Sequence, residues 1–157
     1  MIFLTLGTQL PFDRLARALD AVAADLDEPV FGQIGTTSYV PQNFEHVDFL
    51  DPSGFGTRFE AARVIVGHAG IGTILSGQKA GKPLVLMARR ADQGEHRNDH
   101  QTQTVAQVRR FEGVHIIETE NDLRQCLTQP DLAAMRTDAS QSLMAFRAAL
   151  RDELAKV

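Results

Sequence analysis

Short apolar runs alternate with amphipathic segments along the chain, and this alternation predicts the fold. Runs rich in β-branched residues and leucine predict strands at 2–6, 30–34, 47–50, 64–66, 84–87 and 114–117. Apolar residues at helical spacing predict helices at 12–26, 55–62, 73–80 and in the second half of 94–112. The repeated alternation predicts an α/β fold, a Rossmann-like parallel sheet of about six strands with helices on both faces.

Composition narrows the class of protein. A chain of 157 residues fits a single domain, residues 1–157, in which 131–157 forms a C-terminal helical segment. The net charge of -4 disfavours nucleic acid as a partner. Cys126 is the one cysteine, so an internal disulfide is excluded and a cytoplasmic location is expected. No run approaches the roughly 20 apolar residues of a membrane-spanning helix.

A glycine cluster lies between the strand at 64–66 and the helix at 73–80, and it indicates an anion site. Gly70 and Gly72 let a ligand approach the backbone, and the free N–H groups of a helix start attract phosphate. We expect Thr73 to cap this helix or to donate its hydroxyl, and His68 to bond a phosphate oxygen. The alternative is a tight turn that serves packing, with His68 as hydrogen-bonded scaffold.

Two other phosphate motifs match this region less well. "GTILSGQK" is close to a P-loop, but Gln78 separates Gly77 from Lys79, and the stretch is better explained as a helix. "GIG" begins a dinucleotide fingerprint, but Leu75 occupies the position of its third glycine. An NTPase and a nicotinamide enzyme are therefore the weaker interpretations.

A second cluster of polar residues, at 95–100, has the composition of a metal site. His96 and His100 lie one helical turn apart, with Glu95 and Asp99 beside them. A solvated helix start explains the same residues, so we expect no metal site and no cofactor.

The stretches "MIFLTLGT", "QIGTTSYVP", "VIVGHAGIGTIL", "AGKPLVLMARR" and "GEHRNDHQ" follow one another in the order of a known family. They resemble the C-terminal, donor-binding domain of family 28 glycosyltransferases over roughly residues 1–128. The chain is most similar to the small stand-alone subunits of two-part UDP-sugar transferases, such as the dolichol-pathway N-acetylglucosaminyltransferase and bacterial exopolysaccharide glucuronosyltransferases. The fold implied is the C-terminal half of a GT-B glycosyltransferase.

The resemblance implies three groups of site residues. The diphosphate would lie against Gly7, Thr8, His68, Gly70, Ile71, Gly72 and Thr73. The nucleoside would lie near Gly35, Tyr39, Ser76 and Arg89, and the sugar near Glu95, Asp99 and Gln101. Carboxylate and amide groups suit sugar hydroxyls because they accept or donate in fixed geometry. At Ser76 the family usually has a glutamate that binds the ribose, so the shorter serine is a departure.

The resemblance also implies an activity and a partner. The activity is that of a UDP-sugar-dependent hexosyltransferase, which moves N-acetylglucosamine, glucuronate or a similar sugar to a lipid-linked saccharide with inversion. The acceptor site and the catalytic base would belong to a membrane-anchored partner subunit, which would place this protein at the cytoplasmic face of the membrane. The alternative is a module that binds a nucleotide-sugar or dinucleotide without transferase activity.

The last helical segment carries an apolar stripe whose role the sequence leaves open. The stripe either docks on the partner or folds back over the protein's own sheet, and its residues are Leu143, Phe146, Leu150 and Leu154. Self-association through a surface that would otherwise face the partner also stays open.

Overall fold

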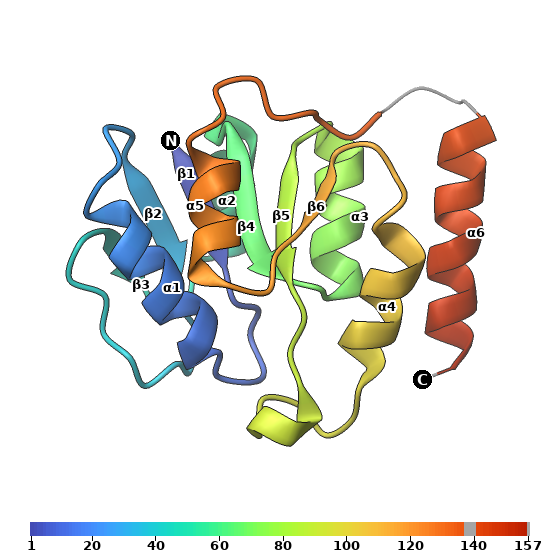
Figure 1. Ribbon diagram of the computed structural model, residues 1–157, viewed down its shortest axis with the longest axis horizontal. Helices are drawn as coiled ribbons and strands as arrows, with labels where there is room; N and C mark the ends of the chain where they lie inside the picture. Colours follow the sequence, from blue (N-terminus) through green and yellow to red (C-terminus); the bar gives the residue numbers. More distant parts are fainter. Residues whose placement is uncertain (137–140, 157) are drawn as a thin grey trace.

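A six-stranded parallel sheet forms the centre of the computed structural model, which describes residues 1–136 and 141–156 (Figure 1). The strand order is β3-β2-β1-β4-β5-β6, and every neighbouring pair is parallel. The prediction of a Rossmann-like α/β fold is confirmed. The strands are β1 (Ile2–Thr5), β2 (Val30–Gln33), β3 (Glu45–Val47), β4 (Val64–His68), β5 (Leu84–Met87) and β6 (Val114–Ile116).

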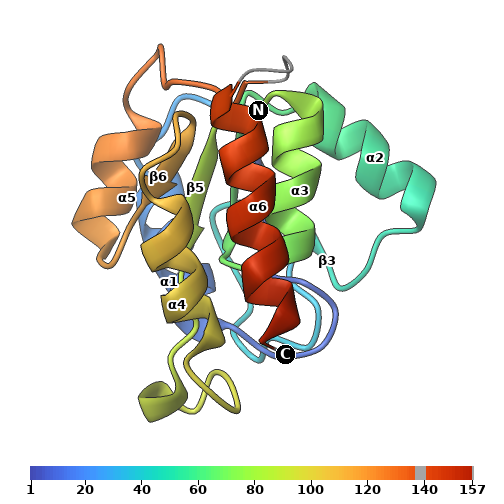
Figure 2. The same cartoon turned by 90° about the vertical axis from the view of Figure 1, so that its right-hand side faces the viewer.

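Helices cover both faces of the sheet (Figures 1 and 2). On one face lie α1 (Asp13–Ala23) and α5 (Glu120–Leu127). The other face is covered by α2 (Pro52–Ala61), α3 (Ile71–Ala80), α4 (His100–Val108) and α6 (Gln141–Ala155). Along β1, Ile2 and Leu4 enter the first core and Phe3 enters the second, which is why this strand is apolar at successive positions. None of the described helices is long and apolar enough to cross a membrane.

The edge strand and the helix that follows it differ from their predicted positions. β3 pairs Glu45 with Phe31 and ends at Val47, so the predicted strand at 47–50 is wrong. The Asp51 side chain accepts a hydrogen bond from the Gly54 N–H at 3.1 Å, and Pro52 occupies the first helical position. This cap starts α2 three residues before the predicted Phe55, which leaves the residues after β3 as the connection to that helix.

The helical segment predicted from residue 131 is also wrong in its first part. Residues 131–136 are not helical, and α6 begins at Gln141. Leu132 is buried in the core under α1 and α5, whereas Met135 is buried in the core on the opposite face. The chain therefore passes from one face to the other over the amino edge of the sheet, where the Met135 N–H donates to the Lys82 carbonyl oxygen at 3.4 Å (Figure 1). Burial of these side chains on two faces overrides local helix propensity.

The C-terminal helix folds back over the sheet. Phe146 and Leu150 are buried in the core shared with α4, and the Phe146 ring meets Phe111 edge to face at 5.1 Å. Of the apolar stripe, Leu154 is 52% exposed, and the Leu143 side chain lies outside the described residues. For Phe146 and Leu150 the structure thus favours packing on the protein's own sheet.

Candidate functional site

A cavity of about 870 Å³ opens at the carboxyl edge of the sheet. The loop after β1, the end of β4 and the first turns of α3 form its walls, and Leu154 of α6 reaches its rim. From β1 the chain builds the sheet in one direction through β2 and β3, and from β4 it builds it in the other direction. Ligands of open parallel sheets bind at such a switch point. All the residues predicted to contact diphosphate line this cavity, namely Gly7, Thr8, His68, Gly70, Ile71, Gly72 and Thr73.

The start of α3 faces the cavity without a side-chain cap. Gly70 is the N-cap residue and Thr73 lies in the first turn. Of the two roles predicted for Thr73, the helix cap is therefore wrong, and donation of its hydroxyl to a ligand stays a prediction. The N–H groups of Ile71, Gly72 and Thr73 have no partner within the helix. A methyl group built on Gly72 would meet nothing within 4 Å. The cavity therefore receives the positive end of a ten-residue helix together with its free donors.

His68 lies at the end of β4, between two glycines that its ring contacts. A side chain on Gly70 would overlap the ring, and one on Gly7, where φ is 75°, would lie 2.8 Å from Nε2. Glycine is needed at both positions because the imidazole occupies that space. Burial, the charge of Arg89 and nearby His96 lower the pKa of His68 to about 3, so the ring is neutral at physiological pH.

Arg89 supports the loop that forms one wall of the cavity. Its side chain is only 3% exposed, and Nη2 donates hydrogen bonds of 2.6 Å to the carbonyl oxygens of Leu6 and Leu10. The guanidinium also lies 5.1 Å from the centre of the Phe12 ring. Burial lowers the pKa of Arg89 to about 10, which leaves the group cationic at neutral pH. Within the described chain its Nε has no hydrogen-bond partner.

The residues predicted to contact the nucleoside are only partly brought together. Ser76 and Arg89 line the cavity. Gly35 lies beside Gly7, because a Cβ atom added to Gly35 would be 2.9 Å from the Gly7 carbonyl oxygen. Tyr39 is on the α1 side, where its hydroxyl donates to Asp20 at 2.6 Å. The described lining of the cavity does not include Tyr39.

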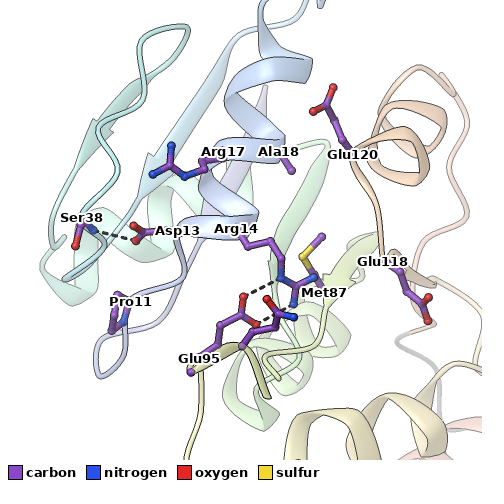
Figure 3. A pocket seen from close by; sticks show the side chains of 12 residues that line it. Pro11, Asp13, Arg14, Arg17, Ala18, Ser38, Met87, Glu95, Glu118 and Glu120 are labelled. Carbon is purple, nitrogen blue, oxygen red and sulfur yellow. Dashed lines mark hydrogen bonds and ion pairs between the residues drawn. The ribbon is translucent and has the colours of Figure 1, made fainter. Parts of the chain in front are cut away.

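The residues predicted to contact the sugar also separate. Gln101 lines the cavity, whereas Glu95 points toward α1 and forms a 2.8 Å ion pair with Arg14 (Figure 3). Glu95 and Arg14 border a different hollow, of about 650 Å³. Asp99 precedes α4 and accepts a hydrogen bond from the Ala91 N–H at 3.3 Å.

The cavity lining includes polar residues that the sequence did not assign to the ligand, among them His96 and Gln33. His96, considered only as a metal ligand, lines the cavity although its neighbour Glu95 does not. Gln33 ends β2 and is buried against the cavity, where its Oε1 accepts a hydrogen bond from the Leu50 N–H at 2.8 Å. Gln33 could have been found in the sequence as a polar residue near the carboxyl end of an apolar strand.

The charge around the cavity is one-sided. The cationic Arg89 lines it beside His68 and His96, and the described lining contains no aspartate or glutamate. The described residues contain no group of three or more His, Cys, Asp or Glu side chains that could hold a metal ion. The chain is net acidic, yet no described carboxylate lines this cavity. The cavity therefore suits an anionic ligand.

The fold is shared with solved glycosyltransferases. The kitacinnamycin glycotransferase is 22% identical, with a TM-score of 0.58 over 97% of this chain and 39% of that one. Acinetobacter baumannii MurG is 20% identical, with a TM-score of 0.62 over 97% and 45%. The solution structure of ALG13 is 16% identical, with a TM-score of 0.63 over 98% and 96%. At these identities the structural similarity shows the fold alone, which is that of the C-terminal half of a GT-B glycosyltransferase.

The chain covers different shares of these three proteins. The chain spans less than half of the kitacinnamycin glycotransferase and of MurG, but nearly all of ALG13. No curated protein sequence matches the chain. The sequence profile of the glycosyltransferase family 28 C-terminal domain matches residues 1–149, and the chain belongs to this family.

Proposed function

We propose that this domain binds the donor of a glycosyltransferase, a UDP-sugar, with the diphosphate at the start of α3. The observation that carries the proposal is the uncapped helix start beside His68 and Arg89, in a cavity whose described lining lacks carboxylates. Helix N–H groups and a buried cation together favour a ligand with two negative charges. Ser76, further along α3, lines the same cavity, and the ribose would bind near it.

The same arrangement supports transfer of the sugar. In the proposed reaction an acceptor oxygen bonds to the anomeric carbon as the bond from that carbon to the diphosphate oxygen breaks. UDP then leaves with the electron pair, and attack from the opposite side inverts the anomeric centre. Negative charge grows on the diphosphate during this step, and the N–H groups of Ile71, Gly72 and Thr73 can stabilise it without a metal ion.

The acceptor, a lipid-linked saccharide, would bind to a second subunit that is anchored in the membrane. This proposal is supported by the similarity to ALG13, a separate chain of similar length, and by the open rim of the cavity at Leu154. That partner would also supply the base that removes the acceptor proton, and through it the domain would lie at the cytoplasmic face of the membrane.

A second function is favoured by one observation. Ser76 lines the cavity where the family usually has a glutamate, and a serine offers the ribose a shorter, uncharged group. A domain that binds nucleotide-sugars without transferring them would tolerate this change.

Calorimetry on a matched pair of variants tests donor binding. A valine at Gly72 would project into the open cavity, whereas Gly56 in α2 also has free space but lies outside the cavity lining. We expect UDP, UDP-N-acetylglucosamine and UDP-glucuronate to bind the native protein, and NADPH to fail. Gly72→Val should weaken UDP binding by at least about 100-fold, because several charge-assisted hydrogen bonds are lost. Gly56→Val should bind as the native protein does.

Equal UDP affinity in the two variants would refute the site. Transfer is tested separately, by incubating the domain with a UDP-sugar and a lipid-linked acceptor, with and without the protein product of the neighbouring gene. Transfer only in the presence of that protein is the expected result. UDP binding without transfer in either case would leave the binding module as the function.

A further inference from the structure

A chain of hydrogen bonds runs from the main chain after β5 to the imidazole in the cavity. The Arg89 N–H donates to Gln101 Oε1 at 3.0 Å, and Gln101 Nε2 lies 3.0 Å from His68 Nδ1. Gln101 is only 6% exposed. The Arg89 N–H can only donate, so it fixes which end of the amide is oxygen. The NH₂ end must then face His68.

This orientation determines the tautomer of His68. An amide NH₂ group has no lone pair to offer, so Nδ1 must be the acceptor and cannot carry a proton. A neutral imidazole then carries its proton on Nε2. That atom faces the Gly7 side of the cavity, and no described protein group accepts a hydrogen bond from it.

We propose that Gln101 is a positioning residue, which holds His68 as a neutral donor with its Nε2–H directed at the ligand. Arg89 acts in this arrangement through its main-chain N–H, which holds the Gln101 amide. Binding of the diphosphate through His68 rests on the proposed function, whereas the tautomer itself does not.

The same hydrogen bonds limit the chemistry that His68 can perform. With its proton on Nε2 and its Nδ1 lone pair bonded to Gln101, His68 has no free lone pair to take a proton from an acceptor hydroxyl. The charged or titratable groups that act on the ring are Arg89 and His96, and both oppose a second proton. His68 is therefore a hydrogen-bond donor, and the base must come from another group.

Two-bond ¹H–¹⁵N correlation spectra of histidine-labelled protein test the tautomer directly. His68 is assigned by its loss in His68→Gln. In the native protein Nε2 should show the shift of a protonated nitrogen and Nδ1 that of an unprotonated one, unchanged from pH 8 to pH 5.5. A proton on Nδ1 would overturn the proposal.

A matched pair of variants tests the role of Gln101. In Gln101→Glu one oxygen still accepts from the Arg89 N–H, but the other now faces Nδ1 and requires a proton there. We expect the Nδ1 signal to change to that of a protonated nitrogen. Gln33→Glu adds the same charge to a buried amide of the cavity that bonds Leu50, and should leave the His68 signals unchanged. An unchanged Nδ1 in Gln101→Glu would refute the role.

Ligand affinity supplies an independent readout. UDP-N-acetylglucosamine suits this test because its diphosphate does not titrate near neutral pH. Its affinity for the native protein should be flat from pH 5.5 to 8. In Gln101→Glu it should fall about tenfold or more as pH rises, because the ring loses its Nε2 proton and turns a lone pair toward the diphosphate. A flat profile in the variant would contradict the proposal. Absence of binding by native protein with the expected spectrum would refute only the donor site.

Discussion

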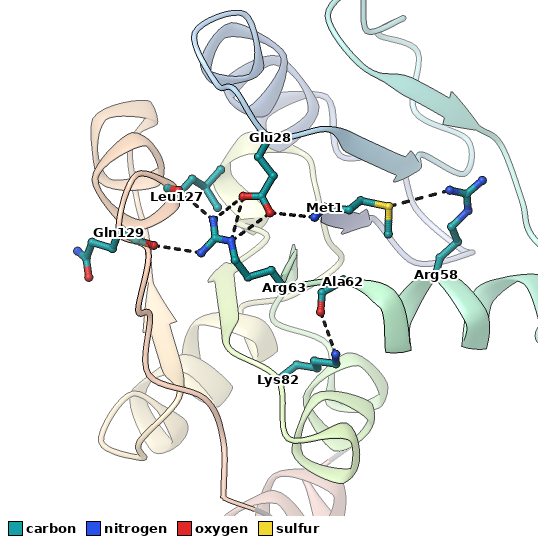
Figure 4. A network of polar contacts seen from close by, with 8 residues as sticks. All are labelled: Met1, Glu28, Arg58, Ala62, Arg63, Lys82, Leu127 and Gln129. Carbon is teal, nitrogen blue, oxygen red and sulfur yellow. Dashed lines mark hydrogen bonds and ion pairs between the residues drawn. The ribbon is translucent and has the colours of Figure 1, made fainter.

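The amino edge of the sheet holds a network of ion pairs (Figure 4). The carboxyl edge instead holds main-chain N–H groups of α3 that have no partner within the helix. At the amino edge Glu28 receives the α-amino group of Met1 at 2.9 Å and the guanidinium of Arg63 at 2.7 Å. Arg63 also donates to the carbonyl oxygens of Leu127 and Gln129, which fixes the end of α5.

The difference indicates what each edge contributes. Partnered groups at the amino edge contribute to stability, because each bond is made in the folded state alone. At the carboxyl edge the start of α3 lacks a cap, and His68 is buried where protonation is disfavoured. The uncapped helix start costs stability in the free protein, and a ligand that accepts its hydrogen bonds would recover that cost. Burial of His68 costs stability only at acidic pH, where the unfolded chain binds a proton that the folded protein does not.

The largest effect we expect is a pH dependence of stability that comes from His68. Its folded pKa is about 3 and its unfolded value is near 6.5, so only the unfolded chain gains this proton between those values. Stability should therefore fall as pH decreases from 6 to 4, by up to about 1.4 kcal/mol per pH unit. Urea unfolding of native protein and of His68→Gln measures the slope.

The other four histidines are present in both proteins, so their contributions cancel in the difference. The native slope should exceed that of His68→Gln by the stated amount. Equal slopes would mean that His68 is accessible to protons when folded, and the contrast between the two edges would lose its main support.

The sequence predicted the sheet well, because buried parallel strands are apolar at successive positions and stand out from amphipathic helices. It also predicted the glycine loop after β4, since glycines between a strand and a helix are typical of a backbone that a ligand approaches closely. The positions of β3 and α2 were harder to predict from the sequence. β3 pairs on one side only and is half exposed, so its composition is weakly constrained, and the Asp51 cap was not recognised.

Within the site, the sequence could not predict the directions in which loop side chains point. Glu95 and His96 are adjacent, yet one pairs with Arg14 and the other lines the cavity. No periodicity applies to an irregular loop, so the sequence could not separate them. Likewise, Arg89 follows β5 as expected, but its bonds to Leu6 and Leu10 depend on a contact between segments about 80 residues apart.

A smaller effect is expected from the amino-edge network. Arg63→Met removes the ion pair with Glu28 and two bonds to carbonyl oxygens, and should lower the free energy of unfolding by about 1.5 kcal/mol at pH 7. UDP affinity should not change, because the network lies at the opposite edge. Arg124→Met, which removes exposed ion pairs with Asp25 and Glu120, serves as the control and should cost less stability than Arg63→Met.

The contribution of this network should also depend on pH. The hydrogen bond from Arg63 lowers the pKa of Glu28. Glu28 therefore contributes stability above its unfolded pKa, near 4.3, and loses the contribution as pH falls through the lower folded value. The difference between native protein and Arg63→Met should narrow below about pH 4. A constant difference down to about pH 3 would show that Glu28 is not the partner that matters.

The smallest effect is expected at the rim of the cavity. Leu154 is 52% exposed and borders the opening, whereas Leu150, one helical turn earlier, is 2% exposed. Leu154→Ser should change the free energy of unfolding by less than about 0.5 kcal/mol, because little packing is lost. Leu150→Ala, the matched control, should cost about 2–5 kcal/mol. Urea unfolding of both variants makes the comparison, and a loss above about 1 kcal/mol in Leu154→Ser would mean that the end of α6 is packed and closes the carboxyl edge.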